Sequence, residues 1–350
     1  MAKKVTLKDI AARTGVTTAS VSMILNGKEL SRFTPETVRR VLDTAQELQY
    51  VSPAARRDQK RIAIISPSVN NPYHTAIIVG IERAALASGY LTAIHNTYWN
   101  PQTELALLRQ MDKRRVAGII YVMNPLQLEM AREVDKHTPV VAVGDIVSHL
   151  GIDTVDVNNF HAAEIVAEHL IRLGHKHIAY LTTSLNDHHI ARVRRCEGLQ
   201  ETFRRLCPEG SVTVLCKENQ MELEIQSPNI ELDSGRELAR EVLEHPEITG
   251  IVAINDMVGY GVLNELIEAG KRVPEDYSLC GFDNVFPSSF AGVQLTSVDH
   301  GTIHYGARAF HLLKDRMEAE RQSSAVYPIT RVEYRSRLIE RGSTARPRED

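Results

Sequence analysis

The chain has 350 residues, of which 43% are hydrophobic and 24% are charged, and its formal net charge is −3. This composition excludes disordered and fibrous proteins, and the length suggests two or three globular domains. No apolar run approaches the ~18–20 residues of a membrane span, and the first residues, MAKKVTLKD, lack the apolar segment of a secretory signal. We therefore expect a cytoplasmic protein with no membrane partner.

The charge is unevenly distributed along the chain. Residues 1–61 contain twelve Lys/Arg and six Asp/Glu, a net charge of +6, so residues 62–350 sum to −9. A small basic head on an acidic body indicates that the head meets a polyanion and that the body has a different role.

Three short helices are predicted in the head. Thr6 and Asp9 have the spacing of a capping box, which opens a helix that Gly15 ends. Thr17 can cap a second helix, which an Asn-Gly pair ends. The sequence TPE at 34–36 predicts the start of a third helix. Its apolar stripe is expected at Val38, Val41, Leu42, Ala45 and Leu48.

Two short helices joined by a turn at Gly15 are typical of a helix-turn-helix, whose second helix fits the DNA major groove. The solvent face of that second helix carries no acid and consists of Thr18, Ala19, Ser22 and Met23. Hydroxyl groups can bond base edges and phosphates, and Ala and Met can pack on a thymine methyl. The alternative is a three-helix bundle without a ligand; the charge segregation and the turn spacing favour DNA binding.

The segments VTLKDIAARTGV, TTASVSMILNG and TPETVRRVLDTAQELQY place several anchors at fixed spacing over residues 5–53. In these segments the head resembles the LacI/GalR family of bacterial transcription regulators. The resemblance implies that Thr18, Ala19 and Met23 read bases. It implies phosphate contacts or helix caps at Thr6, Thr17, Ser20, Ser22 and Asn26.

The head departs from the family pattern in two places. Many members carry Arg where this chain has Met23, and Arg makes the commonest specific contact to guanine. The hinge segment, VSPAARRDQKR at 51–61, lacks the family's Leu and has Gln59 near its place. An apolar side chain that inserts between base pairs bends DNA, so the lack of this Leu argues against a kink at the centre of the operator. Arg56 and Arg57 can still contact the minor groove, and the alternative for this segment is a flexible charged linker.

The body alternates short β-rich runs with helical stretches that begin near Tyr73, Gln102 and Leu126. This alternation predicts parallel sheets, and two sets of units suggest two doubly wound lobes that bind ligand at the carboxyl ends of their strands. No G-x-G-x-x-G follows the first strand and no P-loop occurs, so no cofactor is expected. The expected strands are 62–66, 91–96, 118–122, 140–143, 177–181, 212–216, 250–254 and 278–282.

Segments such as NNPYHTAIIVGIERAALASGY, HLIRLGHKHIAYL and VPEDYSLCGFDN resemble the two-lobed effector domain of the same family, a periplasmic binding protein-like type I fold. The resemblance implies that the chain crosses three times between the lobes. The expected domains are the helix-turn-helix head at 1–50, a hinge at 51–61, an effector-binding and dimerisation domain at 62–342, and a tail at 343–350 that is disordered from Arg346. Lobe one is expected at about 62–157 and 293–322, and lobe two at about 158–292 and 323–342.

No metal site is expected. The four cysteines are scattered without a C-x-x-C pair, which favours a reduced structural role over a disulfide or metal role. The pairs His175-x-His177 and His188-His189 have no Cys or carboxylate at ligand spacing, so metal binding is disfavoured there too.

The family resemblance also implies a set of effector contacts in a cleft between the lobes. Tyr73 and His74 fall where many members carry an aromatic ring against the ligand, Arg195 matches an arginine that holds hydroxyls or a carboxylate, and Asp256 matches an acid that accepts hydrogen bonds. A planar guanidinium and a carboxylate together satisfy neighbouring hydroxyls.

Three further positions are altered relative to the family. Gly144 stands where an acid is common, with Asp145 next to it as a substitute. Ile230 replaces a frequent stacking aromatic, and His189 lies where some members carry Arg. Loss of one stacking ring argues against a large pyranose platform. For each position the alternative is a surface or packing residue.

The sequence thus predicts a homodimeric, sequence-specific regulator, a repressor rather than an activator, that binds a pseudo-palindromic operator in double-stranded DNA. Its small-molecule effector is expected to be a sugar or sugar derivative, with a nucleobase or another metabolite as the alternative. A solute-binding protein would need a signal peptide and no basic head. An enzyme is disfavoured because no G-x-S-x-G, H-E-x-x-H or paired carboxylates occur.

Overall fold

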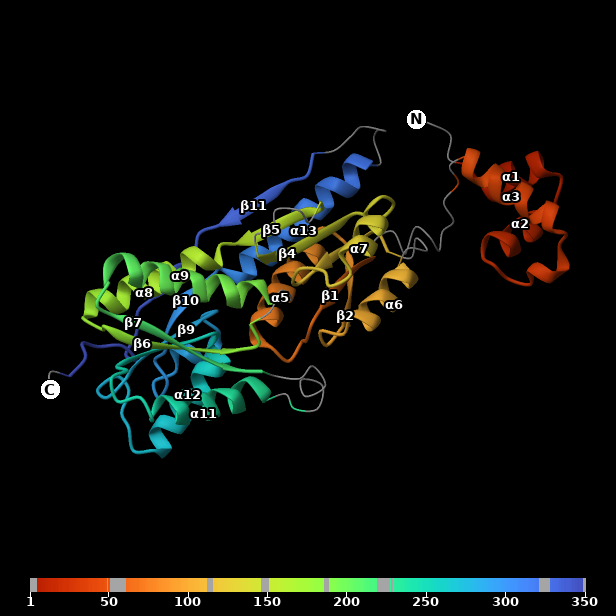
Figure 1. Ribbon diagram of the computed structural model, residues 1–350. Coiled ribbons are helices and arrows are strands. Elements are labelled where there is room, and N and C mark those ends of the chain that lie inside the picture. Colours follow the sequence, from red (N-terminus) through yellow and green to blue (C-terminus); the bar gives the residue numbers. More distant parts are fainter. Residues whose placement is uncertain are drawn as a thin grey trace. The chain divides into compact units, whose positions relative to one another are not determined.

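The structure is a computed structural model that describes residues 5–48, 50, 61–111, 116–145, 151–185, 189–218, 227, 229–320 and 328–348. The chain forms two compact units, residues 1–60 and residues 61–350 (Figure 1). The helices that the structure describes include none that is long and apolar enough to cross a membrane.

The head consists of α1 (Leu7–Thr14), α2 (Thr18–Leu25), the 3-10 turn η1 (Leu30–Arg32) and α3 (Pro35–Glu47). The expected three helices are therefore present. Their buried core consists of Ile10, Val21, Ile24, Val41 and Ala45. Leu42, expected in that core, is 46% exposed, because it follows Val41 around the helix onto the outer edge of α3. Such a small core leaves the head dependent on each of these side chains.

Lobe one of the body is built on a parallel six-stranded sheet in the order β11-β5-β4-β3-β1-β2. Its strands are β1 (Arg61–Ser66), β2 (Leu91–Asn96), β3 (Gly118–Tyr121), β4 (Val140–Asp145), β5 (Asp153–Val157) and β11 (Arg331–Tyr334). Its helices are α5 (Pro72–Ala87), α6 (Pro101–Met111), α7 (Leu128–Asp135) and α13 (Thr302–Glu320).

Both faces of this sheet are covered. Along β1, Ile62 and Ile64 join the apolar cluster that contains side chains of α5 and α13, and Ala63 and Ile65 join the cluster that contains side chains of α6 and α7. Strands that are buried on both faces read as continuous apolar runs, as the sequence of β1 does.

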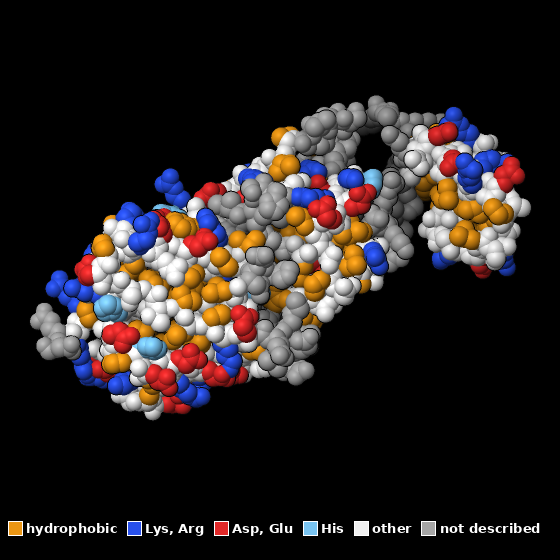
Figure 2. All heavy atoms as spheres, in the orientation of Figure 1, with side chains coloured by type: hydrophobic (Ala, Val, Ile, Leu, Met, Phe, Trp, Pro, Cys, Tyr) orange, Lys and Arg blue, Asp and Glu red, His pale blue; other side chains and the backbone are white. Residues whose placement is uncertain are grey.

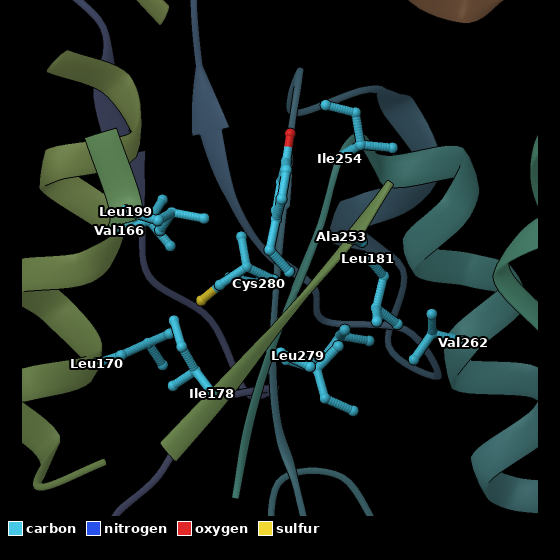
Figure 3. Close-up of a cluster of buried hydrophobic side chains, with 14 of the residues drawn as sticks. Val166, Leu170, Ile178, Leu181, Leu199, Ala253, Ile254, Val262, Leu279 and Cys280 are labelled. Atoms are coloured by element: carbon cyan, nitrogen blue, oxygen red, sulfur yellow. The ribbon is translucent and has the colours of Figure 1, made fainter. Parts of the chain in front are cut away.

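Lobe two repeats this architecture with the strand order β12-β10-β9-β8-β6-β7, in which only the β12 pairing is antiparallel. Its strands are β6 (His177–Thr183), β7 (Ser211–Lys217), β8 (Gly250–Ala253), β9 (Ser278–Phe282), β10 (Thr296–Asp299) and β12 (Arg337–Ile339). Its helices are α8 (Asn159–Leu173), α9 (Ile190–Leu206), α11 (Ile230–Val242) and α12 (Asp256–Glu268), with the 3-10 turn η2 (Phe286–Ser289). Figure 3 shows Val166 and Leu199 of α8 and α9 on one side of the strands, and Val262 of α12 on the other.

Two glycines allow α5 and α13 to pack closely in lobe one. A Cβ atom at Gly80 would collide with the carbonyl of Ile303, and one at Gly306 would collide with the carbonyl of Ile77. Because the obstructing atoms are backbone atoms, they cannot move aside, so each helix needs a glycine where the other crosses it.

The chain crosses between the lobes after β5, after β10 and between β11 and β12. The predicted boundaries at 293 and 323 are therefore wrong. β10 lies in the sheet of lobe two and β11 in the sheet of lobe one, which moves these crossings to residues 300–301 and 335–336. Short strands at a sheet edge carry no pattern that tells which of two similar sheets they extend.

The C-terminal residues 343–348 pack on lobe two, in contrast to the predicted tail that is disordered from Arg346. The hydroxyl of Ser343 donates to the Leu279 carbonyl over 2.6 Å, and the Leu279 N–H donates to the Ser343 carbonyl over 2.8 Å. Nε2 of His175 lies 2.9 Å from the Ala345 carbonyl. Arg348 forms an ion pair with Asp276 at 2.8 Å. The prediction considered only the charged composition of this segment, which gives no indication of these main-chain hydrogen bonds.

Candidate ligand cavity and nucleic-acid interface

The second helix of the head, α2, has one buried side and one accessible side. Val21 and Ile24 are buried in the head core. The accessible positions, exposed or partly exposed, are Thr17, Thr18, Ala19, Ser20, Ser22, Met23 and Asn26. All of the predicted DNA contacts on this helix therefore lie where a ligand can reach them.

Three of the predicted residues hold the helix ends. The Thr17 hydroxyl accepts a hydrogen bond from the Ser20 N–H over 3.2 Å, which caps the start of α2. Nδ2 of Asn26 donates to the Ser22 carbonyl over 2.7 Å at the other end. At the start of α1, the Thr6 N–H donates to the Asp9 carboxylate over 2.7 Å. These bonds satisfy backbone groups that a short helix leaves without partners.

The net charge of the sequence differs between the head and the body. On the face of the body that Figure 2 shows, Lys/Arg and Asp/Glu side chains are intermixed and form no uniform positive surface for a polyanion. Residues 1–61 carry the net charge of +6. Arg56, Arg57 and the rest of the hinge at 51–60 lie outside the described residues.

A cavity of about 310 Å³ lies between the two lobes of the body. Its walls come from the carboxyl ends of strands and from the first turns of helices, where doubly wound folds bind ligands. Among the predicted contacts it is lined by Tyr73, His74, His189, Arg195 and Ile230. Gly144 also lines it, whereas the side chain of Asp145 lies outside the described part of the chain.

Arg195, on α9, is the buried cation of this cavity, with 6% of its surface exposed. Its Nε donates to Oδ1 of Asn159 over 2.7 Å, and its Nη1 donates to the Ile254 carbonyl. Its guanidinium carbon lies 4.3 Å from the centre of the Phe282 ring. These contacts hold the guanidinium in one orientation, so a ligand that binds it causes little further loss of rotamer freedom.

Asp283, which the sequence reasoning missed, is the acid beside Arg195. Its Oδ1 lies 3.6 Å from Nη2 of Arg195, and both residues line the cavity. Burial raises the pKa of Asp283 to about 6, against the opposing effect of the Arg195 charge. The backbone φ of Asp283 is +99°, a region that favours glycine. This backbone conformation is energetically unfavourable for an aspartate, and it accompanies a side chain that points toward Arg195.

Asp256, predicted as this acid, does not line the cavity. It is fully buried beneath it, at the start of α12. Its carboxylate accepts hydrogen bonds from the Ser288 hydroxyl (2.5 Å), the Ser297 hydroxyl (2.6 Å) and the Val285 N–H (2.9 Å). The structure does not place Asp256 in the cavity wall, because Asp256 uses its acceptors to join α12 to β10 and to the segment after β9. The acid at the end of β9, the neighbouring strand, reaches the cavity instead.

The aromatic wall of the cavity is built around Trp99, which the sequence reasoning also missed. It follows β2, is 9% exposed, and is the one tryptophan of the chain. The ring centre of His189 lies 5.1 Å from that of Trp99, and the ring centre of His74 lies 6.4 Å from it. The planes of the two histidine rings are inclined to that of Trp99 by 69° and 61°, so the three rings form an edge-to-face aromatic cluster in the cavity wall.

His74 is neutral and offers an acceptor. Its Nδ1 lies 3.1 Å from the Ser68 carbonyl, which can only accept, so Nδ1 carries the proton and Nε2 keeps its lone pair. Burial lowers the pKa of His74 to about 4, with Arg192 contributing in the same direction and the bond to Ser68 opposing. The ring therefore stays uncharged at neutral pH.

Glu231 connects the lobes at the cavity. It lies on α11 of lobe two, and its Oε2 accepts a hydrogen bond from Nδ2 of Asn71 in lobe one over 3.1 Å. Its Oε1 accepts from Nδ2 of Asn255 over 2.8 Å. Burial raises its pKa. No pattern in the sequence distinguished this glutamate from the others near it.

Comparison with known protein families assigns both units. The family described as bacterial regulatory proteins, lacI family, matches residues 6–52, and the periplasmic binding protein-like domain matches residues 167–344.

Three individual proteins illustrate the similarity. Catabolite control protein A of Priestia megaterium is 30% identical over 95% of this chain and 98% of its own. The HTH-type transcriptional repressor PurR of Mannheimia succiniciproducens is 27% identical over 92% of this chain and 96% of its own. The solved structure of a transcriptional regulator CelR–cellobiose complex superposes with a TM-score of 0.67 at 24% identity, covering 97% of this chain and all of that one.

Proposed function

Because the chain belongs to the LacI family of DNA-binding transcriptional regulators, we propose that it is a homodimeric repressor of a pseudo-palindromic operator. Its affinity for that operator is set by a small sugar or sugar derivative bound between the lobes. The observation that carries the effector assignment is the Arg195–Asp283 pair in a cavity that the ring of Trp99 also lines. Paired donors and paired acceptors next to a flat apolar surface match the edge and the face of a sugar ring.

The operator assignment rests on the head. α2 has its caps in place and its predicted base-reading side chains accessible, and the net charge of residues 1–61 is positive. A single head reaches one half-site, so two heads related by a twofold axis require a pseudo-palindrome. The similarity to a named transcriptional repressor supports repression.

A nucleobase remains the second candidate effector. The rings of Trp99, His74 and His189 lie close together in the cavity wall, and a planar base can stack on the face of one of them or pack edge-to-face against it. The Arg195 and Asp283 side chains also match the donor and acceptor edge of a base. The solute-binding alternative is not supported, because the similarity to regulators covers the head as well as the body.

The effector is tested by following Trp99 fluorescence, which reports on the cavity wall alone because the chain has one tryptophan. D-ribose, D-glucose, cellobiose, adenine and hypoxanthine are titrated in turn. A saturable change with a sugar supports the proposal, and a saturable change with only the two bases selects the second candidate. Operator binding is tested by selection from random DNA. Lack of any enriched palindrome, or an affinity that does not fall as salt rises, counts against the repressor.

Sugar affinity is expected to fall at acid pH. The pKa of Asp283 is raised to about 6, so its carboxylate loses charge and acceptor capacity as pH falls through 6. Binding that needs the ionised form weakens by about tenfold per pH unit below that point. His74, with a pKa of about 4, keeps one charge state over this range. Trp99 titrations between pH 5 and pH 8 measure the profile. Asp283→Asn should flatten it, and an unchanged profile in that variant would remove Asp283 from the binding reaction.

Met23→Arg is expected to change the preferred operator. Met23 lies on the accessible side of α2, where Arg can bond guanine through two donors. The variant should gain a preference for guanine at one position of each half-site, about 10-fold to 100-fold over the other bases. Parallel selections from a randomised operator library measure it. Leu42→Arg adds the same charge on α3 and should keep the wild-type site. Identical sites for Met23→Arg and wild type would show that residue 23 does not face a base.

A further inference from the structure

The second and third crossings between the lobes meet at His300. This residue follows β10 in the second crossing and is 2% exposed. Its Nε2 lies 3.2 Å from Nη2 of Arg195, the buried cation of the cavity. Its Nδ1 lies 2.8 Å from the hydroxyl of Ser336, in the third crossing. One imidazole therefore joins a residue of the ligand cavity to a segment that connects the two lobes.

The direction of these two hydrogen bonds is fixed by chemistry. A guanidinium can only donate, so Nε2 of His300 accepts from Arg195. The proton of the neutral ring must then be on Nδ1, which donates to Oγ of Ser336. Burial and the neighbouring Arg195 charge hold the pKa of His300 well below its usual value, so the ring is neutral.

The same chain of contacts reaches the first crossing and lobe one. Nε of Arg195 donates to Oδ1 of Asn159, which begins α8 directly after the first crossing. The ring of His300 also lies edge-on to Tyr73 of lobe one, with ring centres 6.2 Å apart. The hydrogen-bonded series Asn159–Arg195–His300–Ser336 thus contacts all three crossings, and each of its hydrogen bonds is buried.

We propose that His300 is a positioning residue that binds the Arg195 guanidinium and the third crossing into one hydrogen-bonded unit, so that lobe closure and the orientation of Arg195 change together. The assignment deepens the proposed function and rests on it for its biological meaning. A ligand that binds Arg195 acts through His300 on the crossings between the lobes. A ligand can shift closure only by its difference in affinity for the two states, and a shared hydrogen-bonded unit supplies such a difference.

Trp99 gives a readout of closure that needs neither DNA nor effector. Trp99 belongs to lobe one and His189 to lobe two, and their rings are in contact across the cavity. When the lobes separate, His189 leaves Trp99, whose exposure then rises from 9%. Acrylamide quenching of the fluorescence of this single tryptophan therefore measures how closed the full chain is.

The test uses three variants that each break a chosen bond. His300→Asn places an amide where Nδ1 was, which keeps the Ser336 partner and loses Arg195. His300→Gln places an amide where Nε2 was, which keeps Arg195 and loses Ser336. Ser336→Ala removes the far partner alone. The matched control is His175→Gln, because His175 is also a buried histidine with several partners, all within lobe two.

We expect the quenching constant of Trp99 to rise about twofold or more in all three variants. Ser336→Ala should add nothing in the His300→Gln background, because that bond is already lost. The control should lower the melting temperature and leave quenching unchanged. Wild-type quenching in the His300 variants, or additive effects of His300→Gln and Ser336→Ala, would overturn the proposal. Neither result bears on whether the protein binds an operator or a sugar.

Discussion

Replacing Arg195 by leucine should weaken effector binding by about 100-fold or more and abolish the effector response of the operator complex. Arg195 is 6% exposed and bonds Asn159 and the Ile254 carbonyl, so its guanidinium is held at one place in the cavity. Its loss also leaves the Asp283 carboxylate buried without the neighbouring positive charge. Trp99 titration measures the affinity, and operator binding with and without the compound measures the response.

Arg194 provides the matched control for this change. It neighbours Arg195 on α9, but its side chain is 47% exposed and forms an ion pair with Glu197 at 2.7 Å. Arg194→Leu should therefore keep both effector affinity and response, since an exposed pair contributes little. Melting temperatures of both variants separate binding from folding. An Arg195→Leu protein that responds at the wild-type effector concentration would show that the cavity is not the effector site.

Val21→Asp should eliminate operator binding, with a loss of at least about 1,000-fold at physiological salt. Val21 is fully buried among the five residues of the head core, and a carboxylate there has no partner. Burying an unpaired charge costs several kcal/mol, which is comparable to the whole stability of so small a unit. Electrophoretic mobility shift with the selected operator measures the loss. The body should keep its melting transition and its effector titration at Trp99.

The control for this variant is the same substitution at an exposed site. Leu42→Asp adds one negative charge to the head at a position that is 46% exposed. It should reduce DNA affinity only by the modest electrostatic effect of one charge, which disappears at higher salt. If Val21→Asp behaved like Leu42→Asp, α2 would not depend on the head core, and the docking of that helix on DNA would need another explanation.

The fold could be predicted from the sequence where local signals and periodicity agreed. The caps at Thr17 and Thr34 set the starts of α2 and α3, and the alternation of short β-rich runs such as β1 and β6 with helices indicated parallel sheets. Leu42 was misplaced because helical spacing gives the direction of a side chain but not how far the neighbouring helix extends over it. The later crossings were misplaced because β10 and β11 extend two sheets of the same architecture.

The cavity was only partly predictable for a related reason. Arg195 could be predicted because it matches a ligand-binding arginine of the family, and the structure places it in the cavity wall. Asp256 and Asp283 both follow strands of one sheet, and no sequence pattern tells which carboxylate turns toward the ligand. The answer depends on the backbone of Asp283 and on hydroxyls of Ser288 and Ser297 that reach Asp256 from elsewhere in the chain. Trp99 lies in an irregular segment that has no periodicity to read.

The placement of β11 and β12 has a consequence for synthesis on the ribosome. One edge strand of each sheet comes from residues 331–339, so neither lobe is complete until that segment has been synthesised. The helical unit at the start of the chain is self-contained and emerges hundreds of residues earlier. A nascent or prematurely terminated polypeptide can therefore display a folded DNA-binding head while each sheet of its two-lobed body still lacks an edge strand.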